Sequence, residues 1–307
     1  MRVVIIGLGV QGRKRLAVAG DEVVATVDPV VPEARYDAIE EVPLELFDAA
    51  LVCTPDSSKL DILRYLLSHG KHGLAEKPLL TEDPEALHEL NQLAHAHRVA
   101  CYTAYNHRFE PHIVTLKNIL ESGIIGTPYL IRGFYGNGTA MDVKRSVWRD
   151  RGMGVLPDLG SHLLDLVLFL IGTPSGVFEP WSFDRFENQA FDHALFGLRG
   201  TPAIELEGTL ISWRNTFTFD VFGDRGSAHI NGLCKWGPST LIIRKRVLPS
   251  GRPAEEATTL QQSDPTWALE YAHFKALCQT GSTNLSNDLW INRVLTGLSD
   301  MMTVNAP

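Results

Sequence analysis

Short apolar runs alternate with longer amphipathic segments along the N-terminal third of the chain. The apolar runs predict buried parallel strands, at 1–6, 22–27, 49–53, 73–75 and 99–104. Apolar residues at helical spacing predict helices, at 13–19, 56–69 and 82–98. The segment between Asp28 and Ala49 has room for only a short crossover helix or none. Strands that alternate with helices up to about residue 108 predict an α/β domain with a doubly wound parallel sheet.

The pattern changes after Pro111. Apolar residues at helical spacing predict further helices, at 112–122, 152–170, 267–279 and 285–302. Apolar runs, several of them alternating with polar residues, predict strands, at 129–134, 190–198, 203–212, 216–222, 227–230 and 240–247. This alternation is typical of an antiparallel sheet with one face covered by helices. We therefore divide the chain into domains at 1–110 and 111–307.

Asp158, His162 and Asp165 interrupt the apolar helix expected at 152–170. At this spacing the three side chains fall on one face of an α-helix, about a turn apart. Burying a carboxylate and an imidazole is costly unless a partner or a ligand satisfies them. The pattern is therefore typical of a catalytic site. It also fits a structural alternative, in which Asp158 caps the helix and His162 pairs with Asp165 in the core.

A glycine motif follows the first strand directly. Gly7, Gly9 and Gly12 form a GxGxxG pattern that includes Val10 and Gln11 and opens a helix, which is the context of a dinucleotide-binding turn. Gly7 permits the tight turn, Gly9 lets the backbone approach a pyrophosphate, and Gly12 allows close packing of helix and strand. The N-terminus of the helix then supplies an anion site.

Asp28 ends the second predicted strand about 20 residues after the first glycine, where a carboxylate would hydrogen-bond the adenosine ribose. No arginine is adjacent and a carboxylate would repel a 2′-phosphate, so the sequence favours NAD over NADP. The structural alternative for Asp28 is a simple Asp-Pro turn. Ligands of such sheets bind beyond the carboxyl ends of the strands. Other residues at these ends are Thr54, Pro55, Glu76, Lys77 and 105–108.

Composition excludes several classes of protein. Hydrophobic residues make up 44% and charged residues 21% of the 307 residues, and the formal net charge of −8 argues against a nucleic-acid partner. The four cysteines are scattered without a CxxC pair, which favours reduced thiols in the cytoplasm over disulfides or a metal site. The sequence lacks a signal-peptide pattern and any apolar run of roughly 20 residues, so we expect no membrane partner.

Five motifs in order carry a resemblance over almost the whole chain. They are GLGVQG at 7–12, TP at 54–55, AEKPL at 75–79, NHRFEP at 106–111 and GVLPDLGSHLLDL at 154–166. In these motifs the chain resembles the glucose-fructose oxidoreductase, inositol dehydrogenase and rhizopine catabolism (Gfo/Idh/MocA) family. The resemblance implies an N-terminal Rossmann domain and a C-terminal α+β domain with a large, mostly antiparallel sheet. It also implies a nicotinamide cofactor and a sugar, cyclitol or nucleotide-sugar substrate.

The resemblance assigns the chemistry to Lys77, Asp158 and His162, which match the lysine of the family's EKP motif and the Asp and His of its DxGxHxxD motif. In this family the three residues surround the carbon that gives or receives hydride. Oxidation of a secondary alcohol needs a base for the hydroxyl proton, and an imidazole suits this role near neutral pH. Lys77 would stabilise the developing charge on oxygen, and Asp158 would orient and tune the pair.

Three positions depart from the family's pattern. Asp56 and Lys59 stand where the family often has the asparagine and histidine of TPNxxH, and Arg15 stands where histidine is common. These changes lie near the expected cofactor and leave the proton-transfer residues intact. The residues expected to contact the substrate are Tyr105, Arg108, Trp148, Arg149 and His193.

Arg149 would bind a carboxylate or phosphate while Trp148 stacks on a sugar, and the alternative is a loop anchored by a buried tryptophan. Apolar residues in the alternating strands of 203–247, together with the family's habit, predict a homo-oligomer contact that forms a dimer or tetramer. A metal site is not expected, because the histidines between 69 and 97 lack convergent acidic partners.

The main hypothesis is an NAD-dependent dehydrogenase that acts on CH–OH groups. One alternative is a cofactor-binding regulator whose catalytic residues have decayed, which the presence of Lys77, Asp158 and His162 disfavours. A second is an NAD-dependent glycosidase that oxidises its sugar transiently with the same residues. Turnover without net NADH would distinguish this glycosidase from a dehydrogenase.

Overall fold

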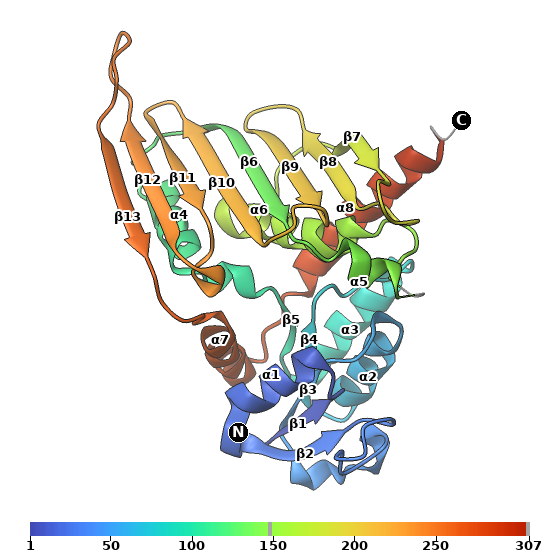
Figure 1. Cartoon of the computed structure of the whole chain (residues 1–307). Coiled ribbons are helices and arrows are strands. Elements are labelled where there is room, and N and C mark those ends of the chain that lie inside the picture. Colours follow the sequence, from blue (N-terminus) through green and yellow to red (C-terminus); the bar gives the residue numbers. More distant parts are fainter. Residues whose placement is uncertain (147–148, 305–307) are drawn as a thin grey trace. The chain divides into compact units, whose positions relative to one another are not determined.

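The structure, a computed structural model, describes residues 1–146 and 149–304 (Figure 1). The chain divides into two compact units, one of residues 1–106 with 266–292 and one of 107–265 with 293–307. The change from the first unit to the second between residues 106 and 107 lies close to position 110, where the expected boundary lies. The return of 266–292 to the first unit was not expected from the sequence.

The first unit is built on a five-stranded, wholly parallel sheet in the order β2-β1-β3-β4-β5. Its strands are β1 (Val3–Ile6), β2 (Val23–Val27), β3 (Ala49–Val52), β4 (His72–Glu76) and β5 (Cys101–Ala104). Between β2 and β3 the described chain forms no α-helix: it forms the 3-10 turns η2 (Ile39–Glu41) and η3 (Leu44–Leu46) and an isolated bridge of Tyr36 with Val27. The predicted doubly wound parallel sheet and its missing crossover helix are both confirmed.

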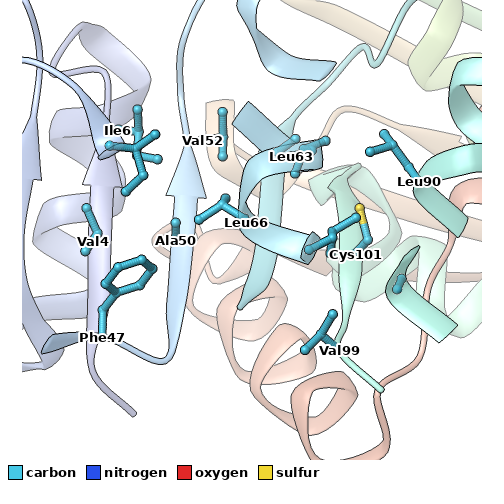
Figure 2. Packing of buried hydrophobic residues seen from close by; sticks show 14 of the residues in the cluster. Val4, Ile6, Phe47, Ala50, Val52, Leu63, Leu66, Leu90, Val99 and Cys101 are labelled. Atoms are coloured by element: carbon cyan, nitrogen blue, oxygen red, sulfur yellow. The ribbon is translucent and has the colours of Figure 1, made fainter. Parts of the chain in front are cut away.

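Helices cover both faces of this sheet because successive residues of a strand point to opposite sides. Val4 and Ile6 of β1 belong to the core that α2 (Asp56–Ser68) and α3 (Pro84–His97) complete, as Figure 2 shows. Val3 and Ile5 belong to a second core with Ala19, at the end of α1 (Val10–Ala19), and with Tyr271 and Phe274 of α7 (Thr266–Thr280). The α7 helix therefore completes the layer that α1 begins.

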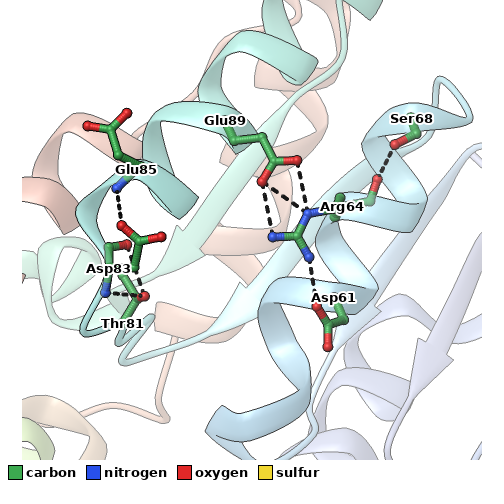
Figure 3. Close-up of polar contacts among 7 residues, drawn as sticks. All are labelled: Asp61, Arg64, Ser68, Thr81, Asp83, Glu85 and Glu89. Carbon is green, nitrogen blue, oxygen red and sulfur yellow. Dashed lines mark hydrogen bonds and ion pairs between the residues drawn. The ribbon is translucent and has the colours of Figure 1, made fainter.

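Polar contacts join and cap the helices of the first layer. The Arg64 guanidinium on α2 donates to the Glu89 carboxylate on α3, and Asp83 caps α3 by accepting from the Glu85 backbone N–H at 3.0 Å (Figure 3). Pro84 occupies the first turn of α3, where its missing N–H costs nothing. These contacts explain why α3 begins two residues later than its helical spacing predicted.

The second unit is built on an eight-stranded sheet in the order β13-β12-β11-β10-β6-β9-β8-β7. Its strands are β6 (Pro128–Gly136), β7 (Glu179–Asp184), β8 (His193–Leu198), β9 (Ala203–Thr209), β10 (Thr216–Gly223), β11 (Gly226–Asn231), β12 (Ser239–Lys245) and β13 (Glu255–Leu260). Only β6 and β9 pair in parallel, so the large, mostly antiparallel sheet is confirmed.

The sequence did not predict β7 and β13, which are the two edges of this sheet. Almost all of β13 is exposed, so its EEATTL sequence shows no apolar alternation. In β7, Pro180 removes a backbone donor, which is tolerated at an edge. Edge strands therefore escape a prediction that depends on burial.

The helices α4 (Pro111–Glu121) and α6 (Ser161–Ile171) pack on one face of this sheet, on β11 and β12 and on β6 respectively (Figure 1). The prediction of one continuous helix over 152–170 was wrong. The chain turns at 152–154, and a π-helical turn η5 (Leu156–Gly160) packs against β9 before α6 begins. The short helix α5 (Ala140–Lys144) is not among the predicted helices, and α8 (Leu285–Val304) follows α7.

Candidate functional site

The three glycines of the first turn have different surroundings. Gly7 has φ +89°, a conformation that side chains rarely adopt. A Cβ on Gly12 would lie 1.8 Å from the Gly7 carbonyl oxygen, so α1 packs directly on the turn. A Cβ on Gly9 would meet no described atom within 4 Å. Val10 and Gln11 are exposed and open α1, whose first turn contains no acidic residue, so the N-terminus of this helix can hold an anion.

Asp28, at the end of β2, is tied to this turn. Its Oδ2 accepts the Leu8 backbone N–H at 2.7 Å, and its Oδ1 accepts those of Val30 and Val31 at 2.9 and 3.0 Å. Burial alone would raise the pKa of Asp28, but these hydrogen bonds and the Arg13 charge outweigh burial and lower it. The carboxylate is therefore held ionised beside the glycine turn, and it also forms the Asp-Pro turn that was its structural alternative.

Thr54 and Pro55 lie between β3 and α2, and Pro55 is the N-cap of that helix. The Thr54 hydroxyl oxygen is buried and has no hydrogen-bond partner among the described residues. A buried hydroxyl without a partner costs free energy that a bound polar ligand would recover. Thr54 and the open side of Gly9 lie at the carboxyl ends of neighbouring strands, so the residues present fit a dinucleotide.

Arg15 holds the turn that follows β4. Its Nε donates to Glu76 Oε1 and its Nη2 donates to Glu270 Oε2, both at 2.6 Å, while its guanidinium lies 4.4 Å from the centre of the Trp267 ring. The side chain is 1% exposed. Burial alone would lower the pKa of Arg15, but Glu270 and Glu76 outweigh it and raise that pKa. The arginine that departs from the family's histidine is thus the cation of a buried Glu-Arg-Glu cluster.

Lys59 holds the same turn from the other side. Its Nζ donates to Asp56 Oδ1 at 2.7 Å and to the Pro78 carbonyl oxygen at 2.9 Å. The second departure from the family's pattern therefore links the turn after β3 to the turn after β4. Lys77 lies between Glu76, held by Arg15, and Pro78, held by Lys59, and is partly exposed.

Asp165 and Arg108 form a buried ion pair in the second unit. Asp165 is fully buried, and its two oxygens accept from Arg108 Nη2 at 2.5 Å and Nε at 2.7 Å. Arg108 lies in η4 (Asn106–Phe109). Asp165 is thus paired with Arg108 and not with His162, contrary to the structural alternative. The planar fork of Arg108 is committed to a carboxylate of the protein itself.

His162 is 6% exposed and its ring stacks on that of His107 of η4, with centroids 4.0 Å apart and planes at 14°. The centroid of the Tyr135 ring, on β6, lies 5.9 Å from that of the His162 ring and 5.2 Å from that of the His107 ring. His107 Nε2 lies 2.7 Å from the Lys235 Nζ of η6 (Cys234–Trp236). The imidazole predicted as the base therefore belongs to a cluster of aromatic and cationic side chains.

Asp158 lies in the π-helical turn η5, where the extra residue changes the spacing expected of an α-helix. Its carboxylate is 37% exposed and lies 3.5 Å from Arg149 Nη2. Burial and the Asp158 charge both raise the pKa of Tyr135, which places Asp158 near the same tyrosine that His162 contacts. Asp158 and His162 thus both lie near Tyr135, whereas the Asp165 carboxylate is engaged by Arg108.

The other predicted substrate residues fall in different places. Tyr105 is 1% exposed at the end of the first unit's sheet, and Trp148 lies outside the described residues. His193 Nδ1 lies 4.0 Å from Glu207 Oε1 of β9. The next residue of that strand, Gly208, points to the opposite face of the sheet, where Val155 and Leu159 lie. His193 is therefore on the open face of the sheet, opposite the helix that bears His162. Lys77 belongs to the first unit, and Asp158 and His162 belong to the second.

Sequence reasoning missed Tyr135, Trp236 and Lys235 and did not single out His107. A histidine three residues after a strand end, beside Arg108, was a signal for His107. Lys235 had no sequence signal, because it is 128 positions from the histidine it contacts. Among the described residues no group of His, Cys, Asp and Glu has an arrangement that would hold a metal ion, and no helix is both long and apolar enough to cross a bilayer.

Two family models match the chain. The model described as an oxidoreductase family with an NAD-binding Rossmann fold matches residues 1–105, and the GFO/IDH/MocA C-terminal domain matches residues 113–229. The chain is 26% identical over 223 residues to the uncharacterized oxidoreductase YdgJ of Escherichia coli strain K12. This match covers 69% of this chain and 63% of YdgJ.

Further comparisons agree in fold. Inositol 2-dehydrogenase 1 of Saccharopolyspora erythraea is 33% identical over 142 residues, or 46% of this chain and 40% of that protein. The chain thus spans less than two thirds of these curated relatives. A solved structure of levoglucosan dehydrogenase in complex with NADH superposes with a TM-score of 0.85 over 99% of this chain and 97% of that one, at 17% identity. At this identity the likeness shows a shared fold.

Proposed function

We propose, from the premise that the chain belongs to the Gfo/Idh/MocA family of NAD-binding oxidoreductases, that it is a dehydrogenase of a secondary alcohol in a sugar, cyclitol or nucleotide sugar. The observation that carries the proposal is the turn that presents Lys77 at the carboxyl edge of the sheet that also bears the glycine motif. This turn is held on both sides, by Arg15 and Lys59, and so keeps a cation at the edge where a dinucleotide binds. The family's relatives named for inositol and levoglucosan support the substrate class.

When bound, NAD supplies the acceptor for the hydride that leaves the alcohol carbon. His162 would accept the hydroxyl proton, so that the alcohol loses two electrons and two hydrogens in all and becomes a ketone. Lys77 would hydrogen-bond the same oxygen and stabilise its negative charge as the proton leaves. Asp158 would orient the proton acceptor and tune its charge. The glycine turn, Asp28, Thr54 and the helix N-termini would bind the dinucleotide.

NAD is the proposed cofactor, with NADP disfavoured. The Asp28 carboxylate is held ionised at the end of β2, where it would accept from the ribose hydroxyls and repel a 2′-phosphate. Glu76 is engaged by Arg15, so its part in cofactor binding would be to position Lys77.

Arg149 is the residue that we propose to bind an anionic group of the substrate. It is 33% exposed, its Nη2 lies 3.5 Å from Asp158 Oδ2, and its fork suits a carboxylate or phosphate. Trp148 would stack on the sugar. Arg108 is bound to Asp165 and Tyr105 is buried, so we propose that each supports its own part of the site instead of contacting the substrate directly. We also propose a cytoplasmic location, because all four cysteines are free thiols.

A substrate screen tests the class of function. Purified protein would be incubated with NAD and a panel of sugars, cyclitols and nucleotide sugars, and both NADH and product would be measured. Net NADH with formation of a ketone supports the dehydrogenase. Conversion of a glycoside without net NADH would indicate the transient-oxidation alternative, and tight NAD binding without any turnover would indicate a regulator.

Substitutions test the residue roles with the substrate that this screen identifies. His162→Ala and Lys77→Ala should each lower turnover by about a hundredfold or more, the scale of a lost general base or oxyanion contact, while NAD affinity changes little. Asp158→Asn should lower turnover less, because it keeps the shape and removes only charge. Thermal unfolding would be measured on the same variants. A well-folded His162→Ala protein with wild-type turnover would remove His162 from the mechanism.

A further inference from the structure

Two buried histidines and a half-buried lysine lie in a row within the second unit, in the order His162, His107, Lys235. Lys235 Nζ lies 2.7 Å from His107 Nε2, and the fully buried His107 ring stacks on His162 with centroids 4.0 Å apart. The three residues come from η6, η4 and α6. Neither His107 nor Lys235 has a part in the chemistry proposed above.

The contact with Lys235 decides where His107 carries its proton. A lysine ammonium has only donors, so the ring nitrogen 2.7 Å away must accept. A charged Lys235 therefore requires a neutral His107 that carries its proton on Nδ1. A second proton on Nε2 would break this hydrogen bond and place an imidazolium against an ammonium, so Lys235 opposes the charging of His107.

Stacking couples this state to His162. Two imidazoles 4.0 Å apart with planes at 14° repel each other if both are charged. A neutral His107 instead offers its π face to a charged His162 ring. Of the two stacked imidazoles, His162 is therefore the one able to take a proton.

Other charged groups lie around the pair, and one of them, Asp264, acts on Cys234 beside Lys235 and offsets part of the lysine's charge. Asp158 lies close to Tyr135, which contacts both rings, and favours a positive charge nearby, whereas Arg149 offsets part of that effect. Burial raises the pKa of Glu110, while Cys234 and the Lys235 charge act to lower it. The Arg108 and Asp165 charges compensate each other.

We propose that Lys235 and His107 are positioning residues that direct a single proton to His162. Lys235 keeps His107 neutral, and His107 fixes the plane of the His162 ring and leaves it as the sole proton acceptor of the pair. This inference rests on the proposed function for its catalytic consequence. The protonation pattern itself is a property of the protein without substrate.

The test follows the ring nitrogens of histidine by NMR in the full-length protein, as a function of pH. In the wild type we expect the His107 signals to show no protonation between about pH 5 and pH 8, where free histidine titrates, while His162 titrates in one step. In Lys235→Met, which keeps the length of the side chain, His107 should titrate and His162 should show two steps, as coupled sites do. Lys235→Arg, which keeps a charged donor, should restore the wild-type pattern.

Two further variants keep the test decisive. Lys245→Met removes an exposed lysine of β12 that pairs with Glu256, and should leave both histidines unchanged. If Lys235→Met fails to fold, His107→Phe keeps a stacked ring without a second site, and His162 should then titrate in one step. A His107 that titrates like free histidine in the wild type, or one that is unaffected in Lys235→Met, would overturn the proposal.

Activity separates this inference from the proposed function. On the substrate found by screening, Lys235→Met should lose about tenfold or more in kcat/KM at pH 6 and less at pH 8, because proton uptake by His107 competes at the lower pH. If His162→Ala retained full turnover, the proposed base would be wrong while the NMR result on His107 stood. If turnover needed His162 but its pH profile were the same in Lys235→Met, the positioning role would be wrong.

Discussion

At the scale of single residues, Gly9 and Gly12 of the same motif are glycines for different physical reasons. Gly12 is constrained by the protein itself, because a Cβ there would collide with the Gly7 carbonyl oxygen. Gly9 faces open space, so the folded chain alone gives no reason for a glycine at this position. The reason at Gly9 would be the pyrophosphate that approaches the backbone.

This difference predicts opposite results for two matched substitutions. Gly12→Ala should lower the free energy of unfolding by roughly 1–3 kcal/mol, the scale of an overpacked core. Gly9→Val should leave stability nearly unchanged and weaken NAD binding at least tenfold, because its side chain would stand where the pyrophosphate must come. Urea denaturation and NAD titration by intrinsic fluorescence would measure the two effects. A Gly9→Val protein with wild-type NAD affinity would place the dinucleotide elsewhere.

Asp28 carries the prediction for cofactor choice. The wild type should bind NAD(H) more tightly than NADP(H), and Asp28→Asn should reduce this preference by roughly tenfold or more, since the negative charge that repels the 2′-phosphate is gone. Asp48→Asn is a matched control, because Asp48 is also an ionised carboxylate of the first unit but binds Arg2 just before β3. Equal or tighter binding of NADP(H) by the wild type would contradict the assignment.

At the scale of elements, buried charge joins segments that are distant in sequence. Arg15 connects α1 to the end of β4 and to α7, and Tyr271 and Lys275 of α7 donate to Glu22 at 2.7 Å each. The Glu22 carboxylate has its pKa lowered by these partners in spite of burial. Helix α7 is therefore held to the first unit by polar contacts as well as by its apolar face.

Removing the central cation should expose how much this cluster matters. Arg15→Met leaves two carboxylates without their partner, of which Glu270 is fully buried, and should lower the free energy of unfolding by roughly 3–5 kcal/mol. The double variant Arg15→Met, Glu270→Gln should recover part of this loss. Arg2→Met removes an exposed pair with Asp48 and should lower the free energy of unfolding far less, because water already screens that pair. If urea denaturation showed equal losses in the free energy of unfolding for Arg15→Met and Arg2→Met, burial of the Arg15 cluster would add nothing to its effect on stability.

At the scale of the whole molecule, no helix among the described residues covers the second face of the eight-stranded sheet (Figure 1). Alternate residues of β6 illustrate it, because Ile131 and Tyr135 are buried whereas Leu130, Arg132 and Phe134 are not. Apolar side chains on this face are interspersed with ion pairs such as Arg132 with Glu205 at 2.6 Å. A mixed apolar and charged face of this kind fits a specific contact between protein surfaces.

We expect this face to form the homo-oligomer contact. Light scattering at micromolar concentration should show a dimer or tetramer, and Phe134→Lys, on the open face, should shift the distribution toward smaller species. Val114→Lys is a suitable control, because Val114 is exposed on α4. A wild-type protein that is only monomeric would rule out this contact.

Local sequence by itself determined the elements whose residue pattern depends only on near neighbours in the chain. The short apolar runs determined the five parallel strands, and GxGxxG determined a turn in which only glycine fits at Gly7 and Gly12. Asp28 and Lys77 could be placed at strand ends because parallel strands present their carboxyl ends at one edge. Such signals need no knowledge of distant contacts.

Tertiary structure alone decided what depends on residues far apart in the chain. It assigned Asp165 to Arg108, stacked His162 on His107 and brought Lys235 to that histidine. The edge strands β7 and β13 and the π-helical turn at Asp158 also escaped prediction, since exposure erases alternation and helical spacing assumes a regular helix. A buried polar group takes whichever partner the fold brings within about 3 Å, and no periodicity in the sequence records that choice.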